Sequence, residues 1–217
     1  MSNEALMEKF KNAVIDMDID MAVEAANEAI ANNVSPLECI EGGLAEGMQT
    51  VSDLFDEGEA FVPELMEASE AFSAALGVLV PSMSDEDKAS ASAGVAVIHT
   101  VEGDIHDIGK NIVTMLFEAN NFEIYDLGRD TAPDVVLEKA KEVGAQIILG
   151  SALMTTTMPG QRALMDLLNA EGVRDQYFVM FGGAPVTKEW CDQIGADAYT
   201  ETATEAVAVA KEYMASR

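Results

Sequence analysis

The spacing of apolar residues divides the chain into two parts that follow different periods. Up to about residue 80, apolar residues recur every three or four positions, which is typical of amphipathic helices. Two such helices are predicted over about residues 6–17 and 18–32. The pair Ser35-Pro36 predicts the start of a third, because serine is a favoured N-cap and proline fits the first helical position. A fourth begins near Pro63, so this part predicts a small four-helix bundle.

From Gly94 onward, short apolar runs alternate with stretches of helical period. The runs, predicted as strands, cover residues 94–98, 122–125, 146–149, 177–181 and 196–199. The helices predicted between and after them cover about residues 107–119, 133–143, 160–170, 187–194 and 202–215. This alternation predicts an α/β fold with a doubly wound parallel sheet of the Rossmann or flavodoxin-like type.

A polar segment separates the two parts. Residues 81–92 read PSMSDEDKASAS, a composition rich in serine and charge that is typical of a linker. The hydrophobic pattern changes from purely helical to alternating strand and helix across this segment. We therefore expect a helical domain over residues 1–88 and an α/β domain over residues 89–217.

The chain is strongly acidic, with 39 Asp and Glu against 12 Lys and Arg and a net charge of −27. Residues 1–88 alone hold 20 acidic and 3 basic residues. A surface of this charge repels phosphate backbones and anionic lipids, which argues against nucleic acid and membranes as partners. The acidity favours either solubility in a salty cytoplasm or docking on a basic protein partner, and both interpretations remain open at this point.

Cysteine usage and the first residues predict a cytoplasmic location. Cys39 and Cys191 are far apart and show no CxxC spacing, which argues against a disulfide framework or a thiol metal site. The segment MSNEALMEKF lacks the basic region and apolar core of a signal peptide. No apolar run approaches the roughly 18 residues that a membrane span needs.

Polar residues that could carry chemistry follow three of the predicted strands. Asp104 and His106 follow the first strand, a run of hydroxyl residues within 151–157 follows the third, and Gly182-Gly183 ends the fourth. Ligands of such sheets bind beyond the carboxyl ends of the strands, so these segments converge on one edge. A carboxylate near His106 can accept one ring N–H and leave the other nitrogen with a free lone pair, as a metal-bound or general-base imidazole requires.

Simpler roles exist for the same residues. Asp104 could cap the following helix, and the threonines could reflect β-propensity alone. A hydrolase triad of Ser151, His106 and Asp104 lacks the GxSxG elbow, and the GxGxxG fingerprint of a nicotinamide site is also absent. A zinc site would need more ligands than His99, His106 and the two cysteines supply at suitable spacing.

Three separated motifs resemble the signature of the B12-binding domain of corrinoid proteins. They are Asp104-x-His106-x-x-Gly109, Ser151-x-Leu153 and Gly182-Gly183. The helical segment before them is similar to the cap of the methyltransferase branch of that family. The phrases SALMTTTM and GGAPVT resemble the corrinoid proteins for methylated amines, in particular those for trimethylamine, and relatives for quaternary amines share them.

The resemblance implies a role for each site residue. His106 would be the lower axial ligand of the cobalt, Asp104 would hydrogen-bond its other nitrogen, and Thr157 would extend this relay. Ser151, Leu153 and Thr155 would line the slot for the nucleotide tail of a corrinoid, and the two glycines would let the tail pass. The full set implied to contact the cofactor is Gly103, Asp104, Ile105, His106, Asp107, Ile108, Gly109, Ser151, Leu153, Thr155, Thr157, Gly182 and Gly183.

The resemblance also implies a function. The chain would be a methyl carrier rather than an enzyme, taking a methyl group from a methylated amine on a partner methyltransferase and giving it to a second one with a thiol or folate acceptor. A reductive activation protein would be a further partner, and the setting would be methylamine metabolism in methanogenesis. Phe61 and Leu65 would either shield the upper cobalt face or form bundle core. A B12-binding sensor without methyl transfer is the alternative function.

Overall fold

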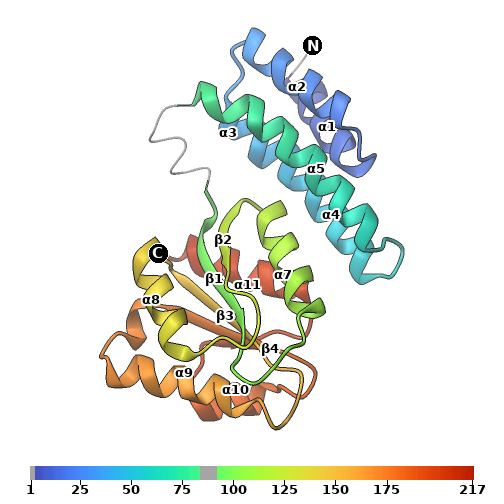
Figure 1. The fold of residues 1–217 in the computed structure, drawn as a ribbon. Helices are drawn as coiled ribbons and strands as arrows, with labels where there is room; N and C mark the ends of the chain where they lie inside the picture. The colour runs from blue at the N-terminus through green and yellow to red at the C-terminus, as the bar shows by residue number, and fades with distance from the viewer. Residues whose placement is uncertain (1–2, 84–91) are drawn as a thin grey trace. The chain divides into compact units, whose positions relative to one another are not determined.

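The computed structural model describes residues 3–83 and 92–217, which form two compact units (Figure 1). The first contains the described residues up to Ser92 together with Glu118–Asn121, and the second contains Ala93–Phe117 and Phe122–Arg217. The predicted boundary between residues 88 and 89 lies outside the described residues. The division into 1–88 and 89–217 therefore stays a prediction.

The first unit is helical, as the sequence predicts. Its elements are α1 (Asn3–Ile15), α2 (Ile19–Ala31), α3 (Pro36–Cys39), the π-helical turn η1 (Ile40–Leu44), α4 (Ala45–Asp56), α5 (Val62–Leu79) and the 3-10 turn η2 (Val80–Ser82). Asp18 caps α2 by accepting the Met21 N–H at 2.9 Å, and the Ser35 side chain caps α3. The predicted third helix is thus one continuous rod, α3–η1–α4, that contains a π turn.

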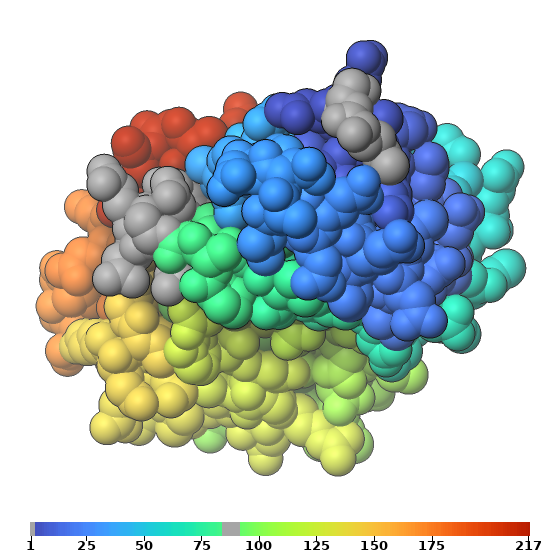
Figure 2. Space-filling view, turned by 90° about the horizontal axis from the view of Figure 1, so that it is seen from above, coloured from blue at the N-terminus to red at the C-terminus, as the bar shows by residue number. Residues whose placement is uncertain are grey.

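Glycines let this rod pack closely on α1. A Cβ on Gly43 would lie 2.7 Å from the Phe10 Cβ, and one on Gly47 would lie 2.7 Å from the Lys11 carbonyl oxygen. Neither distance is possible for a real side chain, so both positions require glycine for packing. Leu65 is fully buried in this unit, whereas Phe61 is exposed, so of the two only Leu65 belongs to the bundle core. Side chains of the first two helices (blue) form most of the surface that Figure 2 shows for this unit.

The second unit is a five-stranded parallel sheet with helices on both faces. Its elements are β1 (Gly94–Thr100), α7 (Ile108–Ala119), β2 (Phe122–Asp126), α8 (Pro133–Val143), β3 (Ile147–Ser151), α9 (Pro159–Ala170), η3 (Arg174–Gln176), β4 (Phe178–Gly182), α10 (Lys188–Ile194), β5 (Ala198–Tyr199) and α11 (Ala203–Ala215). The strand order is β2-β1-β3-β4-β5, the flavodoxin-like order. The predicted doubly wound α/β fold is therefore confirmed.

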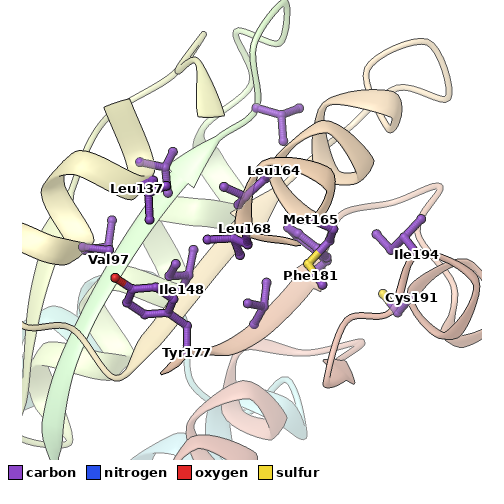
Figure 3. Close-up of a cluster of buried hydrophobic side chains, with 14 of the residues drawn as sticks. Val97, Leu137, Ile148, Leu164, Met165, Leu168, Tyr177, Phe181, Cys191 and Ile194 are labelled. Atoms are coloured by element: carbon purple, nitrogen blue, oxygen red, sulfur yellow. The ribbon is translucent and has the colours of Figure 1, made fainter. Parts of the chain in front are cut away.

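The sheet is buried between two layers of helices. Side chains from α8, α9 and α10 pack on one face and form, with strand residues such as Ile148, the buried cluster in Figure 3 that includes Leu137, Leu164 and Leu168. On the other face, the Tyr213 ring of α11 stacks on Phe178 with centroids 4.2 Å apart. Burial on both faces explains why the strands are near-continuous apolar runs rather than alternating ones.

The register of the sheet brings the three predicted motifs to one edge. Thr100 at the end of β1 pairs with Ser151 at the end of β3, and Ser151 pairs with Gly182 at the end of β4. The loops that follow these strands therefore start side by side, at the edge where doubly wound folds bind ligands. No helix in the described part of the chain is long and apolar enough to cross a membrane.

His99 lies inside the sheet rather than at this edge. Its side chain on β1 is buried, and neither ring nitrogen makes a hydrogen bond of standard geometry to a described residue. A Cβ on Gly150 would lie 3.1 Å from the His99 Nε2, so the ring packs directly over that glycine. Burial lowers the pKa of His99 to about 4, which makes it a neutral core residue at physiological pH.

The acid stability of the protein should depend on His99. Because its pKa falls from 6.5 to about 4 on folding, the unfolded chain binds a proton here at a higher pH than the folded chain does. The free energy of unfolding should therefore drop as pH falls from 6.5 to about 4, by about 3 kcal/mol from this residue. Urea unfolding at about pH 7 and about pH 4.5 should show a smaller loss for His99→Leu. An equal loss in both proteins would contradict the prediction.

Candidate functional site

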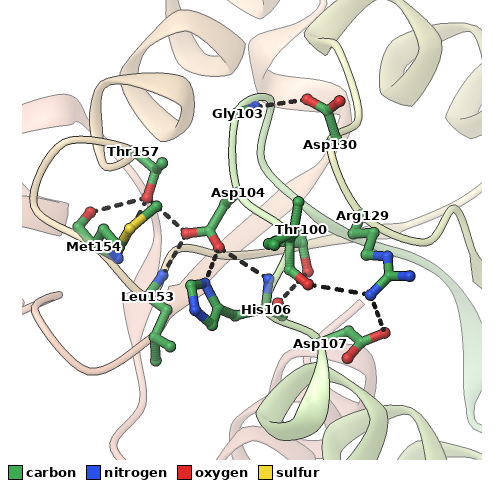
Figure 4. Close-up of polar contacts among 11 residues, drawn as sticks. Thr100, Gly103, Asp104, His106, Asp107, Arg129, Asp130, Leu153, Met154 and Thr157 are labelled. Atoms are coloured by element: carbon green, nitrogen blue, oxygen red, sulfur yellow. Dashed lines mark hydrogen bonds and ion pairs between the residues drawn. The ribbon is translucent and has the colours of Figure 1, made fainter.

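The centre of the site is the loop between β1 and α7, residues Val101–Asp107, here called the His loop. The His106 side chain is 45% exposed at the sheet edge, while the Asp104 side chain is fully buried beneath it. The His106 Nδ1 lies 2.7 Å from the Asp104 Oδ1 (Figure 4). This pair sits two residues apart in the sequence, so the loop itself sets its geometry.

Asp104 is held by donors from two loops. The Thr157 hydroxyl and the Leu153 N–H donate to its Oδ2 at 2.6 and 2.8 Å, and the His106 backbone N–H donates to its Oδ1 at 3.1 Å. Burial alone would raise the pKa of Asp104, but these hydrogen bonds, the Thr157 hydroxyl first among them, hold it well below its ordinary value. Asp104 is therefore a carboxylate that links the His loop to the β3–α9 loop, rather than a cap of α7.

The ionised carboxylate fixes the tautomer of His106. An ionised Asp104 has no proton to give, so the hydrogen of the 2.7 Å bond belongs to the His106 Nδ1. The neutral ring then carries its lone pair on Nε2. The chain Thr157–Asp104–His106 thus prepares one imidazole nitrogen as a ligand or base.

The surface around His106 is apolar. Ile105 and Ile108 are 65% and 79% exposed, and Leu153 and Met154 across the β3–α9 loop are also exposed. Exposed large aliphatic side chains grouped around one imidazole indicate a surface that a flat, largely apolar ligand covers. The remaining residues predicted for this edge are Gly103 and Asp107 in the His loop, Gly109 in the first turn of α7, half-buried Ser151 at the end of β3, and exposed Thr155.

The two glycines at the end of β4 differ in what they face. Gly183 has φ +123°, and a Cβ there would lie 1.9 Å from the Ala152 carbonyl oxygen. Gly182 has room for a Cβ, whose nearest neighbour would be the Thr200 carbonyl oxygen at 3.6 Å. The packing of the protein's own strand ends therefore requires Gly183 but does not require Gly182.

The structure adds residues that the sequence reasoning missed. Gln161 on α9 is fully buried and donates to the carbonyls of Gly150 and Gly182, at 3.3 and 3.2 Å, bridging the ends of β3 and β4. The Trp190 indole N–H donates to the Gln161 Oε1 at 2.9 Å. The sequence did carry one indication of Gln161: it is a polar residue among the apolar positions of the helix predicted over residues 160–170.

A second missed group holds the His loop from the end of β1 and from the turn after β2. Thr100, Arg129 and Asp130 all bond to backbone atoms of the loop (Figure 4). Buried Lys110, in the first turn of α7, forms an ion pair with Asp126 at the end of β2. These contacts join residues distant in the sequence, and no motif pointed to them.

The donor set decides what kind of metal could bind here. In residues 3–83 and 92–217 no group of three or more His, Cys, Asp or Glu side chains could hold an ion. A metal on the His106 Nε2 must therefore bring its other ligands with it, as the metal of a macrocycle does. The apolar rim and the single prepared imidazole fit such a group.

Comparison with known proteins agrees with this chemistry. Residues 94–209 match a family model described as a B12 binding domain, and residues 6–80 match a second model of the same description. The chain belongs to the B12-binding family. Within this family it is 49% identical to dimethylamine corrinoid protein 1 of Methanosarcina acetivorans, over 99% of this chain and all of the relative. It is 46% identical to trimethylamine corrinoid protein 1 of the same organism, over 95% of each chain.

A solved structure extends the match to three dimensions. The methanol:cobalamin methyltransferase complex of Methanosarcina barkeri contains a chain that aligns with a TM-score of 0.83 and 31% identity, over all of this B12-binding chain and 82% of that one. That chain was solved as part of a methyltransferase complex. The family membership and the B12-type cofactor predicted from the three motifs are thereby confirmed.

Proposed function

We propose that this chain is the corrinoid methyl carrier of a methyltransferase system for methylated amines, and is not an enzyme by itself. The observation that carries the proposal is the His106 imidazole. Its Nδ1 lies 2.7 Å from a buried carboxylate, and its own loop carries large exposed apolar side chains. Relatives named for dimethylamine and for trimethylamine match at similar identity, so the proposal names a methylated amine as the donor class.

The residues of the chain have distinct parts in this role. His106 would offer Nε2 to the cobalt, and the ionised Asp104 holds the ring in the tautomer that this requires. The Thr157 hydroxyl and the Leu153 N–H stabilise the negative charge of the buried carboxylate by hydrogen bonds, so it stays ionised without taking a proton. The exposed side chains of Ile105, Ile108 and Leu153 would pack against the macrocycle and shield it from water. When bound, the corrinoid supplies a cobalt that accepts a methyl group and gives it up again.

We further propose three protein partners. A carrier needs a methyltransferase that loads it, a second one that passes the methyl group to a thiol or folate acceptor, and a protein that restores the reduced cobalt. The acidity of residues 1–88, 20 acids against 3 bases, favours partners with basic docking faces. Such docking weakens with added salt, because ions screen the attraction between exposed charges.

Loading with a corrinoid and a methylated amine should test the proposal. The purified chain reconstituted with cobalamin should retain about one corrinoid per chain, which follows from the single prepared imidazole in the site. Addition of a reductant, a methylamine methyltransferase and its amine should then convert the visible spectrum to that of the methylated cofactor. The rate should fall as salt rises.

Two outcomes would separate the proposal from its competitors. A folded chain that retains no corrinoid would refute the cofactor role altogether. A chain that holds the corrinoid but is not methylated with any of a panel of mono-, di- and trimethylamine and betaine systems would refute the carrier role and leave the sensor function. Thr157→Val, which removes the donor to Asp104 at constant shape, is the matched variant and should slow methylation.

A further inference from the structure

The His loop is held by a neighbouring turn rather than by its own hydrogen bonds alone. The turn between β2 and α8, residues Leu127–Ala132, runs alongside it (Figure 4). The Asp130 Oδ1 accepts the Gly103 N–H at 2.7 Å, and the Asp130 N–H donates to the Asp104 carbonyl at 2.9 Å. Asp130 therefore hydrogen-bonds to the backbone of the His loop on both sides of the Asp104 α-carbon, at the Gly103 N–H and at the Asp104 carbonyl.

The conformation of Asp130 makes this double contact possible. Its φ is +55°, in the left-handed region that residues other than Gly, Asn and Asp seldom adopt. This conformation lets the backbone N–H and the carboxylate of one residue reach the same loop. Aspartate tolerates this region better than most residues, so the two contacts can hold Asp130 there at little cost.

Other contacts of the turn have the same target. The Arg129 guanidinium donates to the Ile105 carbonyl at 3.4 Å and lies 3.7 Å from the Asp107 carboxylate. From the end of β1, the Thr100 hydroxyl donates to the His106 carbonyl at 3.0 Å. Each residue from Gly103 to His106 thus has a backbone group hydrogen-bonded to one of these residues, and Asp130 makes two of the four bonds.

We infer that Asp130 is a positioning residue, which sets the place of Asp104 and through it the orientation of the His106 imidazole. This inference rests on the proposed role of His106 as the axial ligand. A ring that bonds a metal tolerates little displacement, because the lone pair must point along the axis of the bond. Loss of the Asp130 side chain would let the loop shift while the core beneath it stays intact.

Three substitutions separate the side-chain bond from the backbone conformation. Asp130→Ala removes the acceptor and strains the left-handed residue, Asp130→Gly removes the acceptor without strain, and Asp130→Asn keeps both the acceptor oxygen and the tolerated conformation. Asp134→Ala serves as the charge-matched control, because this exposed acid bonds only within the first turn of α8 in the described part of the chain. All four should unfold near the wild-type midpoint or within a few degrees of it.

The first readout uses the protein without cofactor. The Gly103 amide should exchange with solvent faster in Asp130→Ala and Asp130→Gly, by roughly fivefold for one lost hydrogen bond of about 1 kcal/mol. The His106 Nδ1 proton, seen by NMR, should shift in the same two variants. Asp130→Asn and Asp134→Ala should match the wild type in both measurements.

The second readout uses the cobalt(III) spectrum of the reconstituted protein. The ratio of histidine-ligated to unligated cofactor should fall roughly fivefold in Asp130→Ala and Asp130→Gly and should be restored in Asp130→Asn. Unchanged amide exchange and an unchanged spectrum in Asp130→Ala would overturn the inference. If the wild type itself shows no histidine ligation, the proposed function fails, and the amide exchange still decides whether Asp130 holds the loop.

Discussion

Replacement of His106 by alanine should abolish the histidine-ligated cobalt(III) spectrum and leave the protein folded. The side chain is 45% exposed in an edge loop, but its loss removes one hydrogen bond from the buried Asp104 carboxylate, so the free energy of unfolding should fall by about 1–2 kcal/mol. The lone pair on Nε2 is the one that the Asp104 carboxylate prepares, and no other histidine reaches the edge of the sheet. The reconstituted variant should therefore show the unligated spectrum and cycle methyl groups poorly.

Two variants calibrate this result. His99→Leu should keep the wild-type spectrum, because His99 is buried inside the sheet and cannot approach a ligand at the edge. Asp104→Asn should keep partial ligation, with activity reduced roughly 10- to 100-fold, as is typical when the partner of a metal-bound histidine is lost. An unchanged cobalt(III) spectrum in His106→Ala would show that His106 is not the ligand and would refute the central assignment.

Gly183→Ala should destabilise the second unit more than a glycine-to-alanine change in an open position. An added Cβ would lie 1.9 Å from the Ala152 carbonyl oxygen, a clash with the backbone that no rotamer change relieves, and the φ of +123° adds strain. We expect a loss of at least about 3 kcal/mol in the free energy of unfolding. Gly144→Ala, at φ +65° with no atom within 4 Å of its Cβ, should lose only about 1 kcal/mol.

The neighbouring glycine tests a different role. Gly182→Ala meets nothing closer than 3.6 Å, so the variant should unfold like the wild type. If Gly182 gives clearance to the nucleotide tail of the cofactor, this well-folded variant should bind corrinoid weakly. If Gly182→Ala binds corrinoid with wild-type affinity, Gly182 does not belong to the binding site. Equal urea midpoints for Gly183→Ala and Gly144→Ala would show that packing does not require glycine at position 183.

Most elements of the fold could be read from the sequence because local chemistry marks their ends. Helix α8 was predicted over its observed range, since Pro133 begins it and Gly144, at φ +65°, ends it. The strands of the second unit were found as unbroken apolar runs, which burial on both faces requires. The π turn Ile40–Leu44 was missed, because one extra residue in a helical turn leaves the spacing of apolar positions almost unchanged.

The site was predicted less evenly than the fold. His106 and Asp104 are neighbours in the sequence, so chemistry alone suggested their pairing. Thr157 lies 53 residues from Asp104. The sequence offered a run of hydroxyl residues that could extend the pair, and the family resemblance singled out Thr157, whose hydroxyl the structure places 2.6 Å from Asp104. Asp130 escaped notice because its role depends on a left-handed φ and on a loop 27 residues earlier, neither of which leaves a pattern in the chain.

Gln161, which bridges the ends of β3 and β4, is hydrogen-bonded to a tryptophan whose fluorescence can report on this bridge. Trp190 is the single tryptophan of the chain, and its indole N–H ends on the glutamine that ties β3 to β4. The Arg162 guanidinium lies over the Trp190 ring, 5.0 Å from its centre, and this cation–π contact also holds the indole in place. Any separation of these two strand ends would exchange the indole bond for water and move the emission to longer wavelength. Fluorescence of the unlabelled protein can therefore follow, in real time, whether this edge of the sheet stays closed while the loops beside it respond to partners.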